Sequence, residues 1–275
     1  MHAFPHVLVP LDFSPSTAPL LRCLPELRAL GATRVTLLHV MPVRYPRAAP
    51  PPEHHALYEE LLAEHARRLR PEGFEIETRL VLGDPPGEIV AAGREADLIL
   101  IGSRGHNLLY RLLIGSTAAE VVRTAETPVL LDRIEPGEDA GCAAVCLAKM
   151  HRVLLATDGS ASAAAAERIA LALADGAERL ILVTALGDGA DDEAAARAHL
   201  EALAATAGGR TTIRLEQASK ASEAISRVAH EEDATLLVVG RHGRGYLSGN
   251  VLGSTAEALA LRSARPVLLV PSSAA

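Results

Sequence analysis

The chain has 275 residues, of which 49% are hydrophobic, and this length predicts two domains with substantial cores. Its formal net charge of −7 argues against a nucleic-acid binder, which usually carries a basic face. Three cysteines, an odd number, form no disulfide framework. No apolar stretch of about 20 residues indicates a membrane span and no leader pattern opens the chain, so a cytoplasmic protein is expected.

Short apolar runs alternate with helical patterns from the start of the chain. The first predicted strand, residues 6–11, ends at Asp12, and a helix is predicted from about Ser16 to Gly31. The proline-rich stretch 42–52 is predicted to be a loop. Further strands are predicted at 34–40, 74–82, 96–101 and 128–132, and helices at about 53–70, 86–96 and 118–125.

The same order of elements returns in the second half. A strand at 152–157 ends at Asp158, the counterpart of Asp12. Further strands at 180–185, 211–217, 235–240 and 266–271 alternate with helices at about 160–175, 194–207, 222–232 and after residue 255. The sequence therefore predicts a tandem duplication, with one domain over 1–135, a linker over 136–150 and a second domain over 151–275.

The linker carries two cysteines, Cys142 and Cys146. No histidine or third cysteine lies close in sequence, so small apolar residues in a helical turn are favoured over a redox pair or half of a metal site. The small-residue run around them is accordingly predicted to be helical.

A glycine-rich loop follows the fourth predicted strand of each half. Gly102-Ser103-Arg104-Gly105 is separated by nine residues from Gly115-Ser116-Thr117, and Gly240-Arg241-His242-Gly243 is separated by nine from Gly253-Ser254-Thr255. A strand, a glycine-rich loop and a helix N-terminus present free N–H groups and the positive end of a helix dipole, which suits phosphate. The lysine of a P-loop is missing from both copies. The alternative is that the glycines only make tight turns.

Alternating strands and helices predict an α/β fold, a mostly parallel sheet with helices on both faces. In such folds ligands bind beyond the carboxyl ends of the strands. If the first and fourth strands are neighbours, Asp12 meets Gly102 at one crevice and Asp158 meets Gly240 at another.

These residues resemble the universal stress protein family, whose ATP-binding members carry G-x2-G-x9-G-[ST] after the fourth strand and an aspartate after the first. Both halves match that pattern, so the resemblance covers nearly the whole chain apart from the linker. It implies two tandem open parallel five-stranded sheets of strand order 3-2-1-4-5, Rossmann-like and similar to adenine nucleotide alpha hydrolases. It also implies that the halves pair through their fifth strands as an intramolecular pseudo-dimer, and it leaves a homodimer open.

The resemblance assigns ligand contacts residue by residue. Asp12 and Asp158 would face the ribose or adenine, and Val40 would line the adenine. The phosphates would contact Gly102, Arg104, Gly105, Gly115, Ser116 and Thr117 in the first half, and Gly240, His242, Gly243, Gly253, Ser254 and Thr255 in the second. The second half departs from the first in having Thr184-Ala185 in place of His39-Val40, and Ala218-Ser219-Lys220 in place of Gly83-Asp84-Pro85.

Each of these residues also has a structural interpretation. The two aspartates could cap the following helices, and Thr117 with Glu120, like Ser254 with Glu257, has the form of a capping box. His39 is interpreted as a core histidine. Arg104, Arg111, Arg241, His242 and Arg244 could neutralise phosphate charge or lie solvated on the loops.

The sequence thus predicts a cytoplasmic, nucleotide-responsive stress regulator that binds ATP, ADP or AMP and contacts neither nucleic acid nor membrane. Mg²⁺ would reach the site through the nucleotide's phosphates. No catalytic residue and no metal ligand is assigned. Two alternatives stay open: a slow ATPase or self-phosphorylating protein that uses Ser116 or Ser254, and an interaction module that binds no nucleotide.

Overall fold

The computed structural model describes residues 3–43, 52–103, 114–136, 142–144, 148–187, 193–208, 210–244 and 252–274. The first half contains β1 His6–Pro10, α1 Thr17–Arg22, β2 Arg34–Pro42, α2 Pro52–Leu69, β3 Glu75–Gly83, α3 Pro85–Gly93, β4 Leu98–Gly102, α4 Ser116–Thr124 and β5 Val129–Asp132. The second half contains β8 Arg152–Ala156, α5 Ala164–Ala174, β9 Arg179–Leu186, α6 Glu193–Ala207, β10 Thr211–Gln217, α7 Ala221–Glu231, β11 Leu236–Gly240, α8 Ser254–Arg262 and β12 Val267–Val270. No helix in these ranges is long and apolar enough to cross a membrane.

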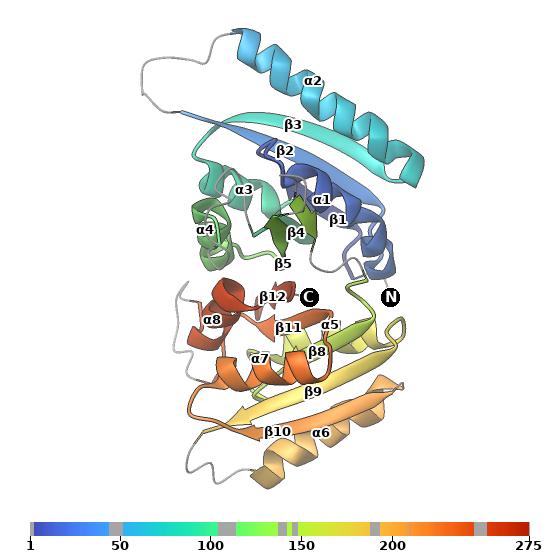
Figure 1. The fold of residues 1–275 in the computed structure, drawn as a ribbon, viewed down its shortest axis with the longest axis vertical. Coiled ribbons are helices and arrows are strands. Elements are labelled where there is room, and N and C mark those ends of the chain that lie inside the picture. The colour runs from blue at the N-terminus through green and yellow to red at the C-terminus, as the bar shows by residue number, and fades with distance from the viewer. Residues whose placement is uncertain are drawn as a thin grey trace.

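Ten strands form one continuous sheet in the order β10-β9-β8-β11-β12-β5-β4-β1-β2-β3. Within each half the strands are parallel and follow the predicted order 3-2-1-4-5. The expected pairing of the halves through their fifth strands is confirmed: β12 pairs antiparallel with β5, with Leu268 opposite Leu130, and the two five-stranded sheets thereby form one. All residues of both strands are buried. Two apolar edges, which would otherwise expose unpaired backbone groups, thereby cover each other (Figure 1).

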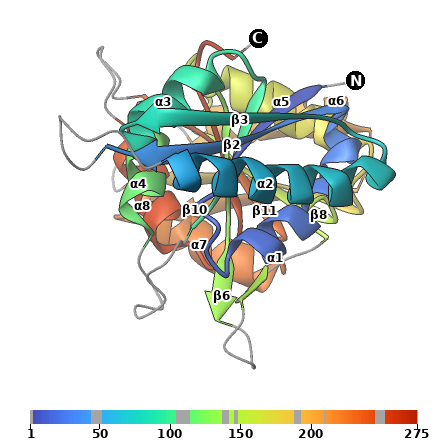
Figure 2. The ribbon, with the colours of Figure 1, turned by 90° about the horizontal axis from the view of Figure 1, so that it is seen from above.

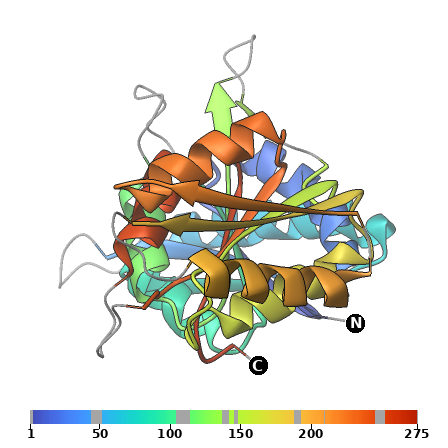
Figure 3. The same cartoon turned by 90° about the horizontal axis from the view of Figure 1, so that it is seen from below.

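Helices cover both faces of the sheet, as predicted for the α/β class. One apolar core lies under α1, α2, α5 and α6, and the other lies under α3, α4, α7 and α8. Alternate strand residues serve the two cores, so that Val7 and Val9 belong to the first and Leu8 to the second. At the edge of the second half, α6 and α7 lie on opposite sides of β9 and β10 (Figure 3).

The first predicted helix is wrong in its extent. Instead of one helix from Ser16 to Gly31, the chain forms α1 and then a 3₁₀ helix, Leu24–Leu30. Pro25 stands at the start of the 3₁₀ segment, where it has no N–H to continue the α-helical hydrogen bonding. Gly31, at φ 90°, ends the segment in the left-handed conformation that favours glycine.

The predicted helical turn in the linker is also wrong. Residues Ile134–Pro136 (β6) and Cys142–Ala144 (β7) form an antiparallel pair, in which Pro136 is opposite Cys142. Alanine favours a helix intrinsically, but pairing with β6 overrides that propensity here. Figure 2 shows β6 projecting from the body of the molecule. Cys146 lies outside the described residues.

A buried polar cluster joins the linker to the first half. Lys149, just before β8, places its Nζ 3.4 Å from Oδ2 of Asp132 at the end of β5, and both side chains are 0% exposed. The backbone N–H of Lys149 donates to Oε2 of Glu26 at 2.9 Å. Burial raises the pKa of the nearby Cys23 thiol to about 12, so this cysteine is a thiol at neutral pH.

We expect Lys149→Met to lower the free energy of unfolding by about 3–5 kcal/mol, because it leaves the buried Asp132 carboxylate without its cation. The double variant Lys149→Met/Asp132→Leu, which removes both charges, should recover most of that loss. Urea denaturation measures both values. A single variant that is no less stable than the double variant would show that the two side chains do not form an ion pair.

Candidate functional site

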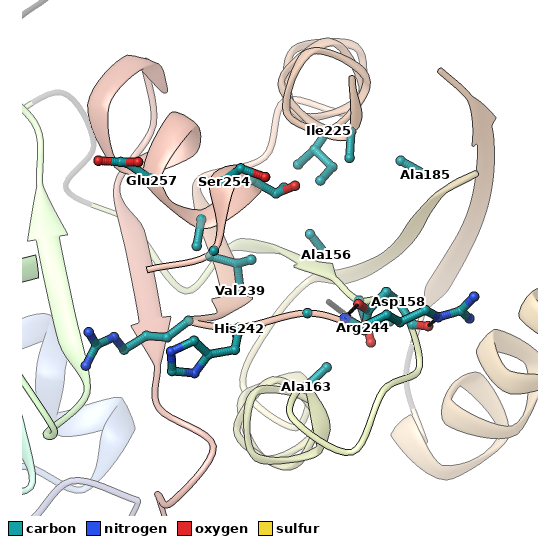
Figure 4. Close-up of a pocket in the computed structure, with 18 of the residues that line it drawn as sticks. Ala156, Asp158, Ala163, Ala185, Ile225, Val239, His242, Arg244, Ser254 and Glu257 are labelled. Carbon is teal, nitrogen blue, oxygen red and sulfur yellow. Dashed lines mark hydrogen bonds between the residues drawn. The ribbon is translucent and has the colours of Figure 1, made fainter. Parts of the chain in front are cut away.

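A cavity of about 770 Å³ opens at the carboxyl ends of β8 and β11. These strands are hydrogen-bonded neighbours, so Asp158 and Gly240 meet at one crevice as predicted. The cavity walls come from the ends of β8, β9 and β11, the glycine-rich loop and the starts of α7 and α8 (Figure 4). The predicted residues Asp158, Gly240, His242, Gly243, Gly253, Ser254 and Thr255 all line it.

The helix α8 begins at this cavity without a side-chain cap. Its N-cap residue is Gly253, in extended conformation, and Ser254 is the first helical residue. In the first half α4 has the same arrangement, with Gly115 as N-cap and Ser116 in the first helical position. Among the described residues neither helix has a side-chain cap hydrogen bond, so the predicted capping boxes are not formed. The N–H groups of these first turns are therefore suited to an anionic ligand.

The loop glycines permit close packing. A Cβ on Gly243 would lie 2.7 Å from Oδ2 of Asp158, and one on Gly253 would lie 3.0 Å from the carbonyl oxygen of Arg241. A Cβ on Gly240 would lie 3.2 Å from the carbonyl oxygen of His242. A Cβ at any of these three positions would displace Asp158 or the loop backbone, so glycine is required for the packing seen here.

Asp158 ties the glycine-rich loop to the first strand. Its Oδ1 accepts from the N–H of Ser160 at 2.9 Å, and its Oδ2 accepts from the N–H of Arg244 at 2.7 Å. Asp158 does not cap the following helix, because α5 starts at Ala164 with Ala163 as its N-cap. Asp12 likewise accepts from the N–H of Ser14 at 2.9 Å and does not cap α1.

The cations of the second loop do not gather at α8. Arg241 is 3% exposed and donates to the carbonyl oxygens of Arg123 and Ala125, at the end of α4. Arg241 lines the cavity, but its guanidinium is hydrogen-bonded to the end of α4. Arg244 donates from Nε to the carbonyl oxygen of Asp158 at 2.9 Å, at the far end of the cavity from Ser254 (Figure 4). The His242 ring lies on the side of the loop away from Ser254 (Figure 4).

The first half repeats this arrangement in the part that is described. β1 and β4 are neighbours, and Asp12 follows β1 while Gly102 is the last residue of β4. The N–H of Gly115 donates to the carbonyl oxygen of Ser103 at 2.9 Å, as that of Gly253 donates to Arg241 at 2.8 Å. Ser116 and Thr117 form the first turn of α4. Arg104, Gly105 and Arg111 lie outside the described residues.

The two halves differ at the carboxyl end of their second strand, where the adenine was expected. Val40, near the end of β2, is 8% exposed and belongs to the core under α3 and α4. The corresponding residue of β9, Ala185, is smaller and lines the cavity. His39 is a core histidine as predicted, since its Nδ1 lies 2.7 Å from the carbonyl oxygen of Leu11 and burial lowers its pKa.

One polar network near the cavity was not predicted. Thr157, which lines the cavity, donates to Oε1 of Glu167 at 2.5 Å and accepts from the N–H of Gly159 at 3.0 Å. The Nε2 of His199 lies 2.8 Å from the same Glu167 oxygen. The signal was a mismatch between the repeats: the first half has Leu11 and Leu21 where the second has Thr157 and Glu167. This network holds the turn that carries Asp158.

Comparison with known proteins matches both halves of the chain to one family. The sequence model of a family described as "Universal stress protein family" matches residues 3–133 and 149–271. A universal stress protein of Mycobacterium tuberculosis is 30% identical over 215 residues, covering 72% of this chain and 70% of the relative. The crystal structure of a universal stress protein from Archaeoglobus fulgidus matches with a TM-score of 0.79 and 26% identity, covering 98% of this chain and 97% of that one. A protein of unknown function from Pseudomonas aeruginosa shares the fold, with a TM-score of 0.67 and 21% identity over 99% of this chain and 95% of its own.

We expect Gly243→Ala to lower the free energy of unfolding by about 1–3 kcal/mol, because the new methyl group would overlap the Asp158 carboxylate. Gly187→Ala is the matched control, since a Cβ there meets nothing within 4 Å. The control should change stability by less than about 0.5 kcal/mol. Equal stability of the two variants in urea denaturation would mean that Asp158 does not pack against Gly243.

Proposed function

The chain belongs to the universal stress protein family, and we propose that it is a nucleotide-responsive regulator that binds ATP or a related adenine nucleotide at its glycine-rich loops. One observation carries the proposal: the uncapped N-terminus of α8 opens into a cavity of about 770 Å³ with Asp158 on its other side. Pockets of about 300–1,000 Å³ are typical of small-molecule and cofactor sites.

The phosphates would bind at the start of α8. The helix dipole and the N–H groups of its first turn favour an anion, and Gly253 lets the backbone approach closely. Ser254 is exposed and would add a hydroxyl donor. Because Arg241 and Arg244 are engaged elsewhere, recognition would depend mainly on backbone N–H groups. Mg²⁺ would arrive with the nucleotide and be held through its phosphates.

The nucleoside would bind at the other end of the cavity. The cavity walls include the aliphatic residues Ala156, Ala185, Ile225 and Val239, which suit the faces of a flat base. Among the described residues, each oxygen of the Asp158 carboxylate accepts one hydrogen bond, which leaves further acceptor capacity for a ribose hydroxyl or an amino group.

The position of Ser254 favours a second candidate, slow self-phosphorylation. Its hydroxyl lies where the terminal phosphates would bind. Transfer of label from γ-labelled ATP to the protein, abolished by Ser254→Ala, would distinguish this activity from binding alone.

We expect ATP to raise the melting temperature by a few degrees, because a ligand that binds only the folded state stabilises it, by about 2.7 kcal/mol at 100 times Kd. The double variant Ser116→Glu/Ser254→Glu should lose this rise. The new carboxylates repel phosphate, although they are compatible with a helix N-terminus.

The control is Ser116→Gln/Ser254→Gln, which adds the same length without the charge and should keep part of the rise. No effect of ATP on the unaltered chain, or an undiminished effect on the glutamate variant, would contradict the proposal.

A further inference from the structure

We propose that the two glycine-rich loops are energetically coupled through Arg241, so that a nucleotide bound in the second half tightens binding in the first. This inference rests on the proposed function, because it concerns the regulation of the same sites. Its evidence is a set of hydrogen bonds that connect each loop to the opposite half.

The backbone of Arg241 is fixed by the elements of its own half. Its N–H donates to the carbonyl oxygen of Val270 at 2.8 Å, and its carbonyl oxygen accepts from the N–H of Gly253 at 2.8 Å. Gly253 is the N-cap of α8, where the phosphates of a ligand would bind. A ligand that further restrains the start of α8 therefore further restrains Arg241.

The side chain of Arg241 leaves this loop and crosses to the first half. It is 3% exposed, and its guanidinium donates to the carbonyl oxygens of Arg123 and Ala125. These carbonyls belong to the C-terminal end of α4, where the helix leaves its last backbone oxygens without partners of its own. A buried cation at this end also complements the helix dipole. The helix α4 is the one whose N-terminus forms the phosphate end of the first site.

A reciprocal connection runs from the first loop to α8. Ser103 donates its N–H to the carbonyl oxygen of Asp132 at 2.7 Å, and its Oγ accepts from the N–H of Ile134 at 3.2 Å. Between these two residues, Arg133 donates from Nη2 to the carbonyl oxygens of Leu259 and Ala260, at 3.1 and 2.6 Å, near the end of α8. Each loop is therefore linked through a buried arginine to the loop helix of the other half.

The expected sign of the coupling is positive. Binding at one loop orders an arginine that holds the other half's helix, so the second ligand has less ordering left to bring about. Linkage requires the effect to be reciprocal: each site tightens the other by the same factor, which for typical coupled sites is about 5- to 150-fold.

Calorimetric titration with ATP tests this on three forms of the full chain. Ser254→Glu leaves the first site, Ser116→Glu leaves the second, and the unaltered chain has both. Independent sites give an isotherm for the unaltered chain equal to the sum of the other two. We expect the second ATP to bind at least about fivefold more tightly than that sum predicts, and Arg241→Met to restore additivity.

The matched control is Arg123→Ala. It removes an exposed ion pair across the same interface, from Arg123 Nε to Glu257 Oε1 at 3.4 Å, but keeps the carbonyl that Arg241 binds. This variant should keep the coupling. If Arg241→Met does not fold, Arg241→Lys replaces it in the test. Lysine retains the buried charge with a single nitrogen, so this variant should fold and show intermediate coupling.

Hydrogen exchange gives a readout that a merely structural role would not move. In Ser116→Glu, ATP binds only in the second half, yet amide exchange in the last turn of α4 should slow, and Arg241→Lys should reduce that protection. Binding at both sites with additive isotherms and unchanged α4 exchange would overturn the coupling alone. Absence of ATP binding in every form would overturn the proposed function, and the coupling with it.

Discussion

The antiparallel pairing of β5 with β12 is the constraint on which the rest of the structure depends. It turns two half-sheets into one and buries the apolar last strand of each half. Because the two strands run in opposite directions, the carboxyl end of one half-sheet lies beside the amino end of the other. In each half the glycine-rich loop is at the carboxyl end and the C-terminus of the loop helix is at the amino end. The pairing therefore brings the second loop against the end of α4, and the segment after β5 against the end of α8.

This geometry explains how the loop arginines are used. A guanidinium on a glycine-rich loop near a phosphate site suggests an anion ligand, but a nearby helix C-terminus offers carbonyl oxygens that are already part of the fold. Arg241 binds the carbonyl oxygens at the end of α4 and is almost fully buried there. The proposed anion site would then consist of backbone N–H groups and a helix dipole, which have a fixed direction. Such a site discriminates by shape and by hydrogen-bond geometry more than by total charge.

The sequence was sufficient for features that depend on local periodicity and spacing. The duplication, the class of fold and the meeting of Asp158 with the second loop follow from the order of strands and from glycine spacing, and the strand order followed from the family resemblance. The prediction of one continuous first helix was wrong at Pro25. The apolar stripe continues past this residue, but its missing N–H interrupts the α-helical hydrogen bonding. The predicted capping box at Ser254 is not formed, because Gly253 occupies the N-cap position. The direction of Arg241 could not be predicted, because its partners are 116 and 118 positions away in the chain.

The two halves differ where side chains, and not the backbone, shape the site. Both keep an aspartate after the first strand that accepts from the N–H two residues on, and both keep a glycine as the N-cap of the loop helix. Away from the loop, leucines in the first half are replaced by the hydrogen-bonded Thr157 and Glu167 in the second. In a homodimer a single sequence would serve both sites, so neither could change alone. Fusion of the two copies in one chain removes that restriction, and the buried hydrogen bonds between the halves connect the two proposed sites although their side chains differ.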